Sequence, residues 1–407
     1  MVRYELKKVF SRTGGKISVI ALILLVVMVS VFAITNVSFV DSDGKSSSGP
    51  MAARSLRNLK TEWTGYLTED VFAEVIRQNA AVEATPEAKS KDWHENNKAY
   101  AMKQGYSDIR DIINSALSSF REYNYYNIDV ADQTVAGEIY DRRISNLKEW
   151  LASDEASYRY SSEQKEFFLS KYQELETPLY YEDADGWTAA LEYTQSVIMI
   201  MMLILSFPVC SVFTAEYQLK ADAVFFSSTE GRRRGTKAKL IAGILMISVI
   251  YWAVFLLYTT IVLSVLGVGG WNCPIQTSLM GWKSIYNMTY LEVYSLTAVG
   301  GYLGTLFILI AEMLISVITR SAVVSVALPF ILLFIPSFVG NIQSLSGFLG
   351  LFPDQLLQVG VAVRYFNAYQ IGESVIGALP ILFSLYPALF ILMIPMVYQI
   401  FRKSEIC

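Results

Sequence analysis

Long runs of apolar residues alternate with charged stretches along this chain. The first run covers residues 17–40, and five more cover residues 194–215, 240–268, 296–318, 321–339 and 378–401. Each is close to the length of about 20 residues that a helix needs to cross the hydrocarbon core of a bilayer. The pattern therefore predicts six transmembrane helices.

Residues 41–193 contain no run of that length, and their apolar positions recur every three to four residues. Ile109 and Ile112 belong to one such series, and two further series follow it. This spacing is typical of amphipathic helices. Ser161, followed three positions later by Gln164, is typical of the capping box that begins a helix. We expect a mainly helical domain inserted between the first and second transmembrane helices.

The remaining connections differ in character. Only Thr319 and Arg320 separate the fourth and fifth runs, which predicts a tight helical hairpin. Residues 269–295 join the third and fourth runs. Residues 340–377 are too polar to span the membrane, and we expect them to lie at its surface or to re-enter it.

Basic residues indicate the orientation. Fourteen lie in residues 1–16, residues 216–239, Arg320 and the tail 402–407, whereas the loops 269–295 and 340–377 hold two, Lys283 and Arg364. Because the chain changes sides with each of the six spans, all four basic segments lie on the same side of the membrane. The positive-inside rule assigns that side to the cytoplasm. The first run is too long for a cleavable signal peptide and predicts a retained signal anchor. We predict a multi-pass protein of the bacterial cell membrane, with both termini cytoplasmic and residues 41–193 extracellular.

Composition agrees with a membrane protein and excludes several function classes. Of 407 residues 53% are hydrophobic and 17% are charged, below the roughly 25% charged residues of soluble domains. The net charge of −4 gives no indication of nucleic-acid binding. Residues 41–192 carry 17 basic and 28 acidic side chains, a net charge of −11. This acidity fits an ordinary solvated surface or a face that attracts cations.

Catalytic chemistry finds little support in the sequence. The three cysteines are far apart and form no disulfide framework or metal-binding pair, and the single histidine, His94, cannot supply a multi-histidine zinc site. Gly44-Lys45-Ser46 lacks the earlier glycine of a nucleotide-binding P-loop, because Phe39 occupies that position. We predict a flexible linker here, no metal site, no catalytic residue and no enzymatic activity of the chain's own.

One acid, Glu312, lies within an apolar run with apolar residues on both sides. Placing a charge at the centre of a membrane helix costs about 2.5–3.5 kcal/mol on insertion scales, so this side chain should face a partner or a water-filled path. A structural role, with a partner such as Arg320, and a role in transport both remain open.

The charged insert between the second and third runs, residues 216–239, combines six basic residues with an amphipathic stretch. Leu219, Ala223 and Phe226 follow the i, i+4, i+7 spacing of one helix face. A cluster of basic residues that fixes membrane topology would explain the charges alone. A short helix under the membrane with Phe225 and Phe226 at its tip would instead suit docking into a groove of a cytoplasmic partner.

The order of residues in this insert resembles the coupling segment of ABC-2-type transporter permeases. Glu216, then Ser228-Thr229, Gly231-Arg232 and Ala238-Lys239, recur in that family between the second and third spans, although Lys220-Ala221-Asp222 replaces the usual Gly-Thr. The layout is also similar, with six spans, a large extracellular insertion after the first and a tight turn between the fourth and fifth. Sodium-efflux and lantibiotic-immunity permeases share this plan.

The resemblance implies an all-α membrane protein that acts as the permease subunit of an ABC-type exporter. It would move a peptide, a lipid-like compound or an ion outward in a homodimer or a heterodimer with a second permease, surrounded by membrane lipid. ATP and Mg²⁺ would be bound by a separate cytoplasmic ABC ATPase, and this chain would hold no cofactor. The implied coupling residues are Glu216, Leu219, Phe225, Phe226, Ser228, Thr229, Arg232 and Lys239.

Two other functions remain open from the residues alone. The chain could be a non-transporting receptor or immunity protein whose extracellular domain binds a ligand, or a secondary transporter driven by an ion gradient. A secondary transporter is expected to contain several intramembrane carboxylates that form a relay, and the runs offer Glu312 alone.

Overall fold

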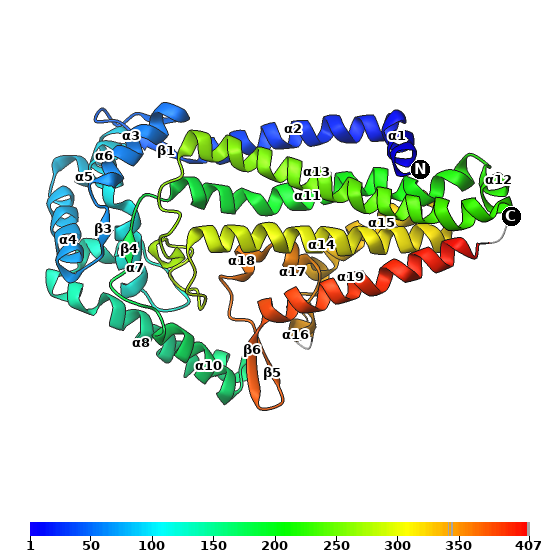
Figure 1. Cartoon of the computed structure of the whole chain (residues 1–407). Coiled ribbons are helices and arrows are strands. Elements are labelled where there is room, and N and C mark those ends of the chain that lie inside the picture. The colour runs from blue at the N-terminus through cyan, green and yellow to red at the C-terminus, as the bar shows by residue number, and fades with distance from the viewer. Residues whose placement is uncertain (341, 343–344, 405–407) are drawn as a thin grey trace.

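Six long apolar helices form a single bundle in the computed structural model, which describes residues 1–340, 342 and 345–404 (Figure 1). They are long and apolar enough to cross a membrane, as the sequence predicts. Parts of the predicted loop 340–377 and tail 402–407 lie outside the described residues. The six helices are α2 (Thr13–Asn36), α11 (Asp185–Gln218), α13 (Thr236–Leu266), α14 (Tyr290–Thr319), α15 (Ala322–Val339) and α19 (Ala378–Arg402).

Several helices begin or end outside the apolar runs. Helix α14 begins at Tyr290, six residues before its run, because Thr289 and Glu292 form a capping box that starts the helix there. Helix α11 extends from Asp185 to Gln218. Helix α2 ends at Asn36, before the end of the first apolar run, because residues 38–40 form a strand. The predicted hairpin is present, with Arg320 in the left-handed conformation and Ser321 capping α15.

Helices α11 and α14 form the centre of the bundle. In the most apolar 18-residue stretch of each of these helices, 67% is buried inside the molecule. The corresponding share is 11% in α15 and 17% in α19. Helix α11 packs against α2, α13, α14 and α15. The faces of α15 and α19 that lie away from this centre are therefore free to contact lipid or another subunit.

Glycines on α14 allow close packing in the middle of the bundle. A Cβ atom on Gly301 would lie 2.5 Å from a side-chain atom of Ile198, and one on Gly304 would lie 2.9 Å from Leu357. Leu357 belongs to the connection between α15 and α19, and Gly304 lies 14 residues from the start of α14, or about 21 Å along its axis. The connection therefore re-enters the bundle. It contains α16 (Ser346–Leu349), α17 (Asp354–Leu357) and α18 (Val359–Ala362).

A second, mainly helical part of the chain, called the lobe, covers one end of the bundle (Figure 1). Its α-helices are α3 (Pro50–Thr61), α4 (Glu69–Glu83), α5 (Pro86–Lys89), α6 (Trp93–Lys103), α7 (Ser107–Leu117), α8 (Ile139–Leu151), α9 (Asp154–Arg159) and α10 (Ser162–Gln173), with 3-10 turns η1 (Gln104–Tyr106), η2 (Asn127–Val130) and η3 (Gln133–Glu138). The predicted capping box of Ser161 and Gln164 is present at the start of α10.

Strands are few and short. The antiparallel pairs are β1 (Ser38–Val40) with β2 (Ser46–Ser48), β3 (Gly65–Tyr66) with β4 (Tyr180–Tyr181), and β5 (Ala368–Ile371) with β6 (Ser374–Gly377). The β1–β2 hairpin contains the Gly44-Lys45-Ser46 stretch that we expected to be a flexible linker. Here Gly44 turns the chain with φ of +81°, so this stretch is an ordered turn and not a linker.

The loop after α13 belongs to the core of the lobe, which the sequence did not indicate. Trp282 and Ile285 are only 2% and 3% exposed, and they pack against side chains of the lobe. Arg143 on α8 donates hydrogen bonds to the carbonyl oxygens of Trp282 and Ser284, both at 2.9 Å. The loop also contains η5 (Ile275–Thr277). Phe366 and Ala368, from the connection between α15 and α19, also belong to this core. The lobe is therefore built from distant stretches of sequence, two of which are joined by a buried arginine.

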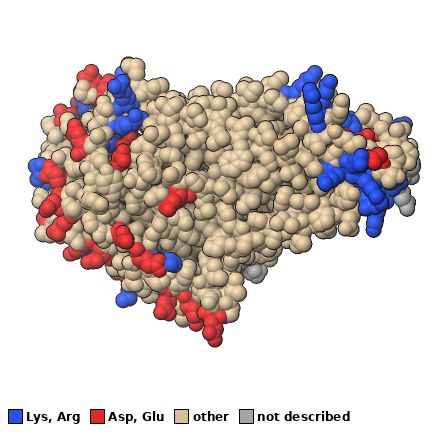
Figure 2. Space-filling model, viewed as in Figure 1, with Lys and Arg blue, Asp and Glu red and all other residues tan. Residues whose placement is uncertain are grey.

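Charge is distributed unequally between the two ends of the molecule. Figure 2 shows acidic side chains spread over the lobe and basic side chains gathered at the opposite end, with the middle of the bundle almost free of charge. The N-terminus and the end of α19 lie at the basic end (Figure 1). The charge asymmetry deduced from the sequence thus corresponds to a physical separation along the bundle.

Candidate functional site

The insert 216–239 lies at the basic end of the bundle, where α11 and α13 project beyond the other helices (Figure 1). Helix α11 ends at Gln218, and Lys220 then adopts a φ of +53° that turns the chain. Helix α12 (Asp222–Ser227) follows, and a π-helical turn, η4 (Gly231–Gly235), leads into α13. Ser228 stabilises the turn between α12 and α13 by accepting a hydrogen bond from the Gly231 N–H at 3.0 Å.

The turn at Lys220 makes the predicted single amphipathic helix wrong. A left-handed residue interrupts the helical repeat, so positions on its two sides no longer share a face. Leu219 is 60% exposed, whereas Phe226 is 1% exposed. Val224, which the spacing did not select, is 77% exposed.

The two phenylalanines do not form an exposed tip. Phe226 packs edge-on against Phe401 at the end of α19, with ring centroids 5.2 Å apart, and lies 6.2 Å from the ring of Tyr217. Phe225 is half-buried and packs against Phe226 and Phe401. This aromatic cluster fixes α12 to the bundle. A role of Phe226 in direct docking does not fit its burial.

Arg232 joins the insert to the end of α19. Its Nε donates to the carbonyl oxygen of Phe226 at 2.6 Å, and its Nη1 donates to the carbonyl oxygens of Arg402 and Ser404 at 3.3 and 3.2 Å. Carbonyl oxygens at a helix C-terminus lack partners within the helix, and an arginine is well suited to bind them. Ser228 and Thr229 lie exposed beside it.

Glu216 and Lys239, which are 23 positions apart in the sequence, form a buried ion pair of 2.7 Å. Lys239 has no exposed surface, and its ammonium also binds the carbonyl oxygen of Val212 at 3.0 Å. The structure therefore brings together the first and last residues of the predicted coupling set. The pair bridges the ends of α11 and α13.

The pair continues at both ends into α1 (Val2–Ser11), which the sequence reasoning did not include in the site. Lys8 forms an ion pair with Glu216, and Glu5 forms one with Lys239 at 2.8 Å. The sign of charge alternates along this ion chain, Lys8–Glu216–Lys239–Glu5. Glu5 is the sole acid in residues 1–16, and Val9 is buried against the bundle. An acid within a basic amphipathic segment is the signal that could have indicated this contact.

Glu312 lies inside the bundle, away from this site. Its side chain has no exposed surface, and its Oε1 accepts a hydrogen bond from Ser206 on α11 at 3.1 Å. Its Oε2 has no hydrogen-bond partner among the residues that the structure describes. Arg320 lies over the ring of Tyr217, 5.0 Å from its centroid. The observed partner of Glu312 is thus a serine on the neighbouring helix.

No known protein family, curated protein or solved structure matches this chain. Within the described residues, no three histidine, cysteine, aspartate or glutamate side chains are grouped in a way that could hold a metal ion. The chemistry of the insert must therefore be judged from its own geometry. That geometry is a small exposed surface on α12, held by an aromatic cluster, an arginine and an ion chain.

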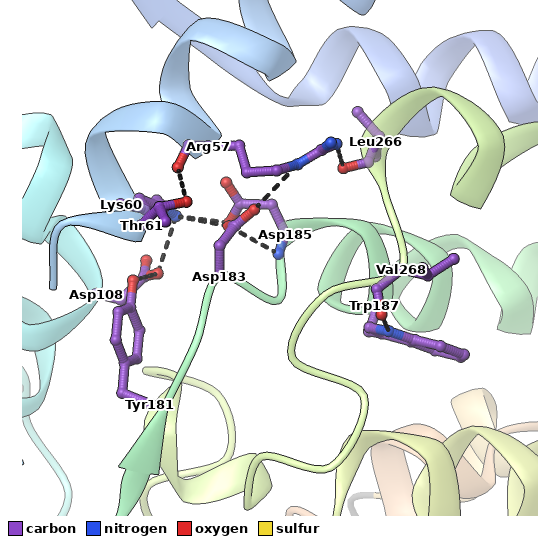
Figure 3. Close-up of polar contacts among 10 residues, drawn as sticks. All are labelled: Arg57, Lys60, Thr61, Asp108, Tyr181, Asp183, Asp185, Trp187, Leu266 and Val268. Carbon is purple, nitrogen blue, oxygen red and sulfur yellow. Dashed lines mark hydrogen bonds and ion pairs between the residues drawn. The ribbon is translucent and has the colours of Figure 1, made fainter. Parts of the chain in front are cut away.

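A second buried polar cluster joins the lobe to the bundle (Figure 3). Lys60 on α3 forms ion pairs with Asp108 at 2.9 Å and Asp185 at 2.6 Å, and Asp183 lies 4.0 Å away. Arg57 binds Asp183 at 3.6 Å and also the carbonyl oxygen of Leu266 at the end of α13. We call these five residues the junction cluster.

The charges in the junction cluster do not balance. Burial alone would lower the pKa of Lys60, but three nearby carboxylates outweigh it and hold that pKa well above its usual value. Burial and the charge of Asp185 raise the pKa of Asp183 to about 7. Two cations thus face three carboxylates, and one carboxylate gains a proton near neutral pH.

Proposed function

We propose that this chain is the membrane permease subunit of an ABC-type exporter. The observation that carries the proposal is the insert 216–239, which projects from one end of the bundle and is fixed to several helices. A force applied to α12 passes to α11 and α13 through the Glu216–Lys239 pair and to α19 through Arg232. Such a rigid connection suits a segment that transmits the motion of a separate ATPase.

The docking surface proposed here differs from the one expected from the sequence. Leu219 and Val224 are exposed on the insert, and exposed Arg233 and Arg234 lie close by in the sequence. Exposed apolar side chains bordered by arginines are frequent in protein interfaces. We therefore assign contact with the ATPase to Leu219, Val224 and the exposed Ser228-Thr229 pair, and a bracing role to Phe226, Arg232, Glu216 and Lys239.

The proposed orientation places the basic end in the cytoplasm and the acidic lobe outside a bacterial cell. The excess of lysine and arginine at the end that carries the insert supports this orientation (Figure 2). ATP and Mg²⁺ belong to the partner ATPase in this proposal, since the sequence contains no P-loop. The exposed faces of α15 and α19 are the surfaces on which a second copy or a similar permease would pack.

Co-purification tests the proposal. The tagged chain, expressed with the ATPase encoded nearest to its gene, should retain that ATPase through purification. The double variant Leu219→Asp and Val224→Asp should lose it, because both side chains are exposed and the changes leave the aromatic cluster intact. Val130→Asp is the matched control, since Val130 is 87% exposed on the lobe.

Three outcomes would contradict the proposal. If no ATPase binds the chain, a receptor or immunity protein becomes the better explanation. If substrate movement in vesicles needs an ion gradient and no ATP, the chain is a secondary transporter. If the double variant retains the ATPase as well as the Val130→Asp control does, the insert is not the docking surface.

A further inference from the structure

A cavity of about 730 Å³ lies where the lobe meets the re-entrant connection. The lobe contributes side chains from α8, α9 and the loop after α7, and the opposite wall comes from the end of α15 and from residues 346–367. We call it the basic cavity, because its lining includes Arg121, Arg159, Lys283 and Arg364 and, among the described residues, no acidic side chain. A basic cavity in the acidic half of the molecule needs an explanation.

Two of its four cations share a single carboxylate, which neutralises one of their two charges. Glu155 forms ion pairs with Arg121 at 3.1 Å and with Arg159 at 3.9 Å. All three side chains are about half exposed, so these pairs lie in contact with solvent at the rim. They contribute little attraction for a ligand.

Lys283 and Arg364 differ from this pair. Among the described residues, the Lys283 ammonium donates hydrogen bonds to the carbonyl oxygens of Phe120 at 2.6 Å and Glu122 at 3.4 Å, and it lies 5.5 Å from the centre of the Phe120 ring. The Arg364 guanidinium has no hydrogen bond and no ion pair within the part of the chain that the structure describes. Burial lowers the pKa of both groups. The charge of the Glu192 carboxylate acts on Arg364 from beyond ion-pair distance and opposes the effect of burial only in part. Partly buried cations with so little compensation are costly unless an anion binds them.

The position of the basic cavity relative to the bundle indicates the kind of anion. Pro336 and Gly340, at the lobe end of α15, form part of its lining. Along the same helix, Phe334 is 48% exposed and Phe338 is 82% exposed. These two phenylalanines lie on the face of α15 opposite to Pro336 and Gly340. Only 11% of the most apolar stretch of α15 is buried, so an acyl chain can also lie on the cavity side of the helix and bring its head group to the cavity. Trp150 and Tyr365 in the lining are of the type found at membrane surfaces.

We infer that the basic cavity binds the phosphate head group of an anionic membrane lipid, with Arg364 and Lys283 contacting the phosphate and the acyl chains lying along α15. A guanidinium binds phosphate through two parallel hydrogen bonds, and the lysine adds a point charge. The lipid would join the lobe to the re-entrant connection. This inference does not depend on the proposed transport function, because it requires only that the six helices span a membrane.

Lipid binding to the purified full chain tests the inference. Native mass spectrometry would compare phosphatidylglycerol with phosphatidylcholine, and inorganic phosphate would serve as the head-group anion alone. The wild-type chain should prefer phosphatidylglycerol. Arg364→Gln should weaken that preference by about tenfold, as expected for the loss of one charge-assisted contact. Arg364→Lys should retain most of it, because the charge remains.

Lys148→Gln is the matched control, since Lys148 is an exposed residue of α8 and its replacement changes the net charge equally. This control matters because the basic end of the molecule also attracts anionic lipid. An equal loss of preference in Lys148→Gln and Arg364→Gln would overturn the inference. So would an unchanged preference in Arg364→Gln, or saturation of the cavity by inorganic phosphate at concentrations at which phosphatidylglycerol does not bind.

Discussion

Exchanging the charges of Glu216 and Lys239 tests whether the ion chain at the basic end acts as one unit. An isolated ion pair usually tolerates such an exchange, because the attraction is restored with reversed sign. Here each partner has a second neighbour of opposite charge, Lys8 beside Glu216 and Glu5 beside Lys239. The double variant Glu216→Lys and Lys239→Glu would keep the central attraction and make both outer contacts repulsive.

The size of this effect follows from the exposure of the outer residues. Two unit charges about 4 Å apart interact by about 4 kcal/mol at an effective dielectric constant of about 20, whereas an exposed pair contributes about 1 kcal/mol or less. The side chains of Lys8 and Glu5 are 32% and 18% exposed, which places them between these limits. Reversing a contact replaces an attraction with a repulsion of similar size, so each contact changes by about twice its energy. Two reversed contacts should therefore weaken the attachment of α1 by about 4–16 kcal/mol.

A fourfold exchange distinguishes the ion chain from simple damage to the fold. Adding Lys8→Glu and Glu5→Lys makes all three contacts attractive again and leaves the net charge of each segment unchanged. Recovery should be incomplete by about 1.5–3 kcal/mol, because a glutamate at position 239 cannot donate to the Val212 carbonyl oxygen as Lys239 does.

Hydrogen exchange of the backbone amides of α1, measured by mass spectrometry on the full chain, is the assay. Protection should fall strongly in the double variant and return largely in the fourfold variant. Exchanging the exposed pair Glu138 and Arg142 is the control and should not affect α1. The reasoning is refuted if the double variant protects α1 as well as the fourfold variant does.

Three further predictions concern other parts of the molecule. Asp183 has a pKa of about 7 in the folded chain and an ordinary value of 3.8, so folding binds a proton and thermal stability should fall as the pH rises from about 4 to 7. Asp183→Asn should weaken this dependence, whereas the exposed control Glu166→Gln should leave it unchanged. Gly301→Ala should lower stability by about 1–3 kcal/mol through overpacking against Ile198, and Gly347→Ala, with open space around its Cβ position, should not. Glu312→Gln should raise the melting temperature at pH 8, because the amide carries no charge and can still accept from Ser206; a lower melting temperature would show that the carboxyl group itself stabilises the bundle.

The helical bundle could be predicted from the sequence, but the insert could not. Apolar runs of membrane length indicate helices because a lipid-exposed backbone must satisfy its hydrogen bonds within the helix. The conformation of residues 215–228 depended on one left-handed residue, Lys220, which no pattern of apolar positions reveals. Phe226, which we expected at an exposed tip, is buried after this turn, and Val224 is exposed instead.

The partners of the candidate residues were also not predictable. Glu216 and Lys239 stood out by their order in the sequence, yet their contacts with Lys8 and Glu5 bring together residues more than 200 positions apart. The same holds for Arg143, whose binding of the Trp282 carbonyl oxygen joins the lobe to a loop between two membrane helices. Such contacts depend on how helices pack, and helix periodicity alone does not determine packing partners.

By itself, the sequence determined the number of membrane-length helices, the helical character of the lobe and the separation of charge between the two ends. These features follow from local composition and spacing, because burial in lipid and helix formation act on neighbouring residues. Only the tertiary structure decided which side chains of the insert are exposed, which ions pair at each end and where the basic cavity forms. These features depend on contacts between distant segments, since a buried charge is stable only where folding supplies its partner.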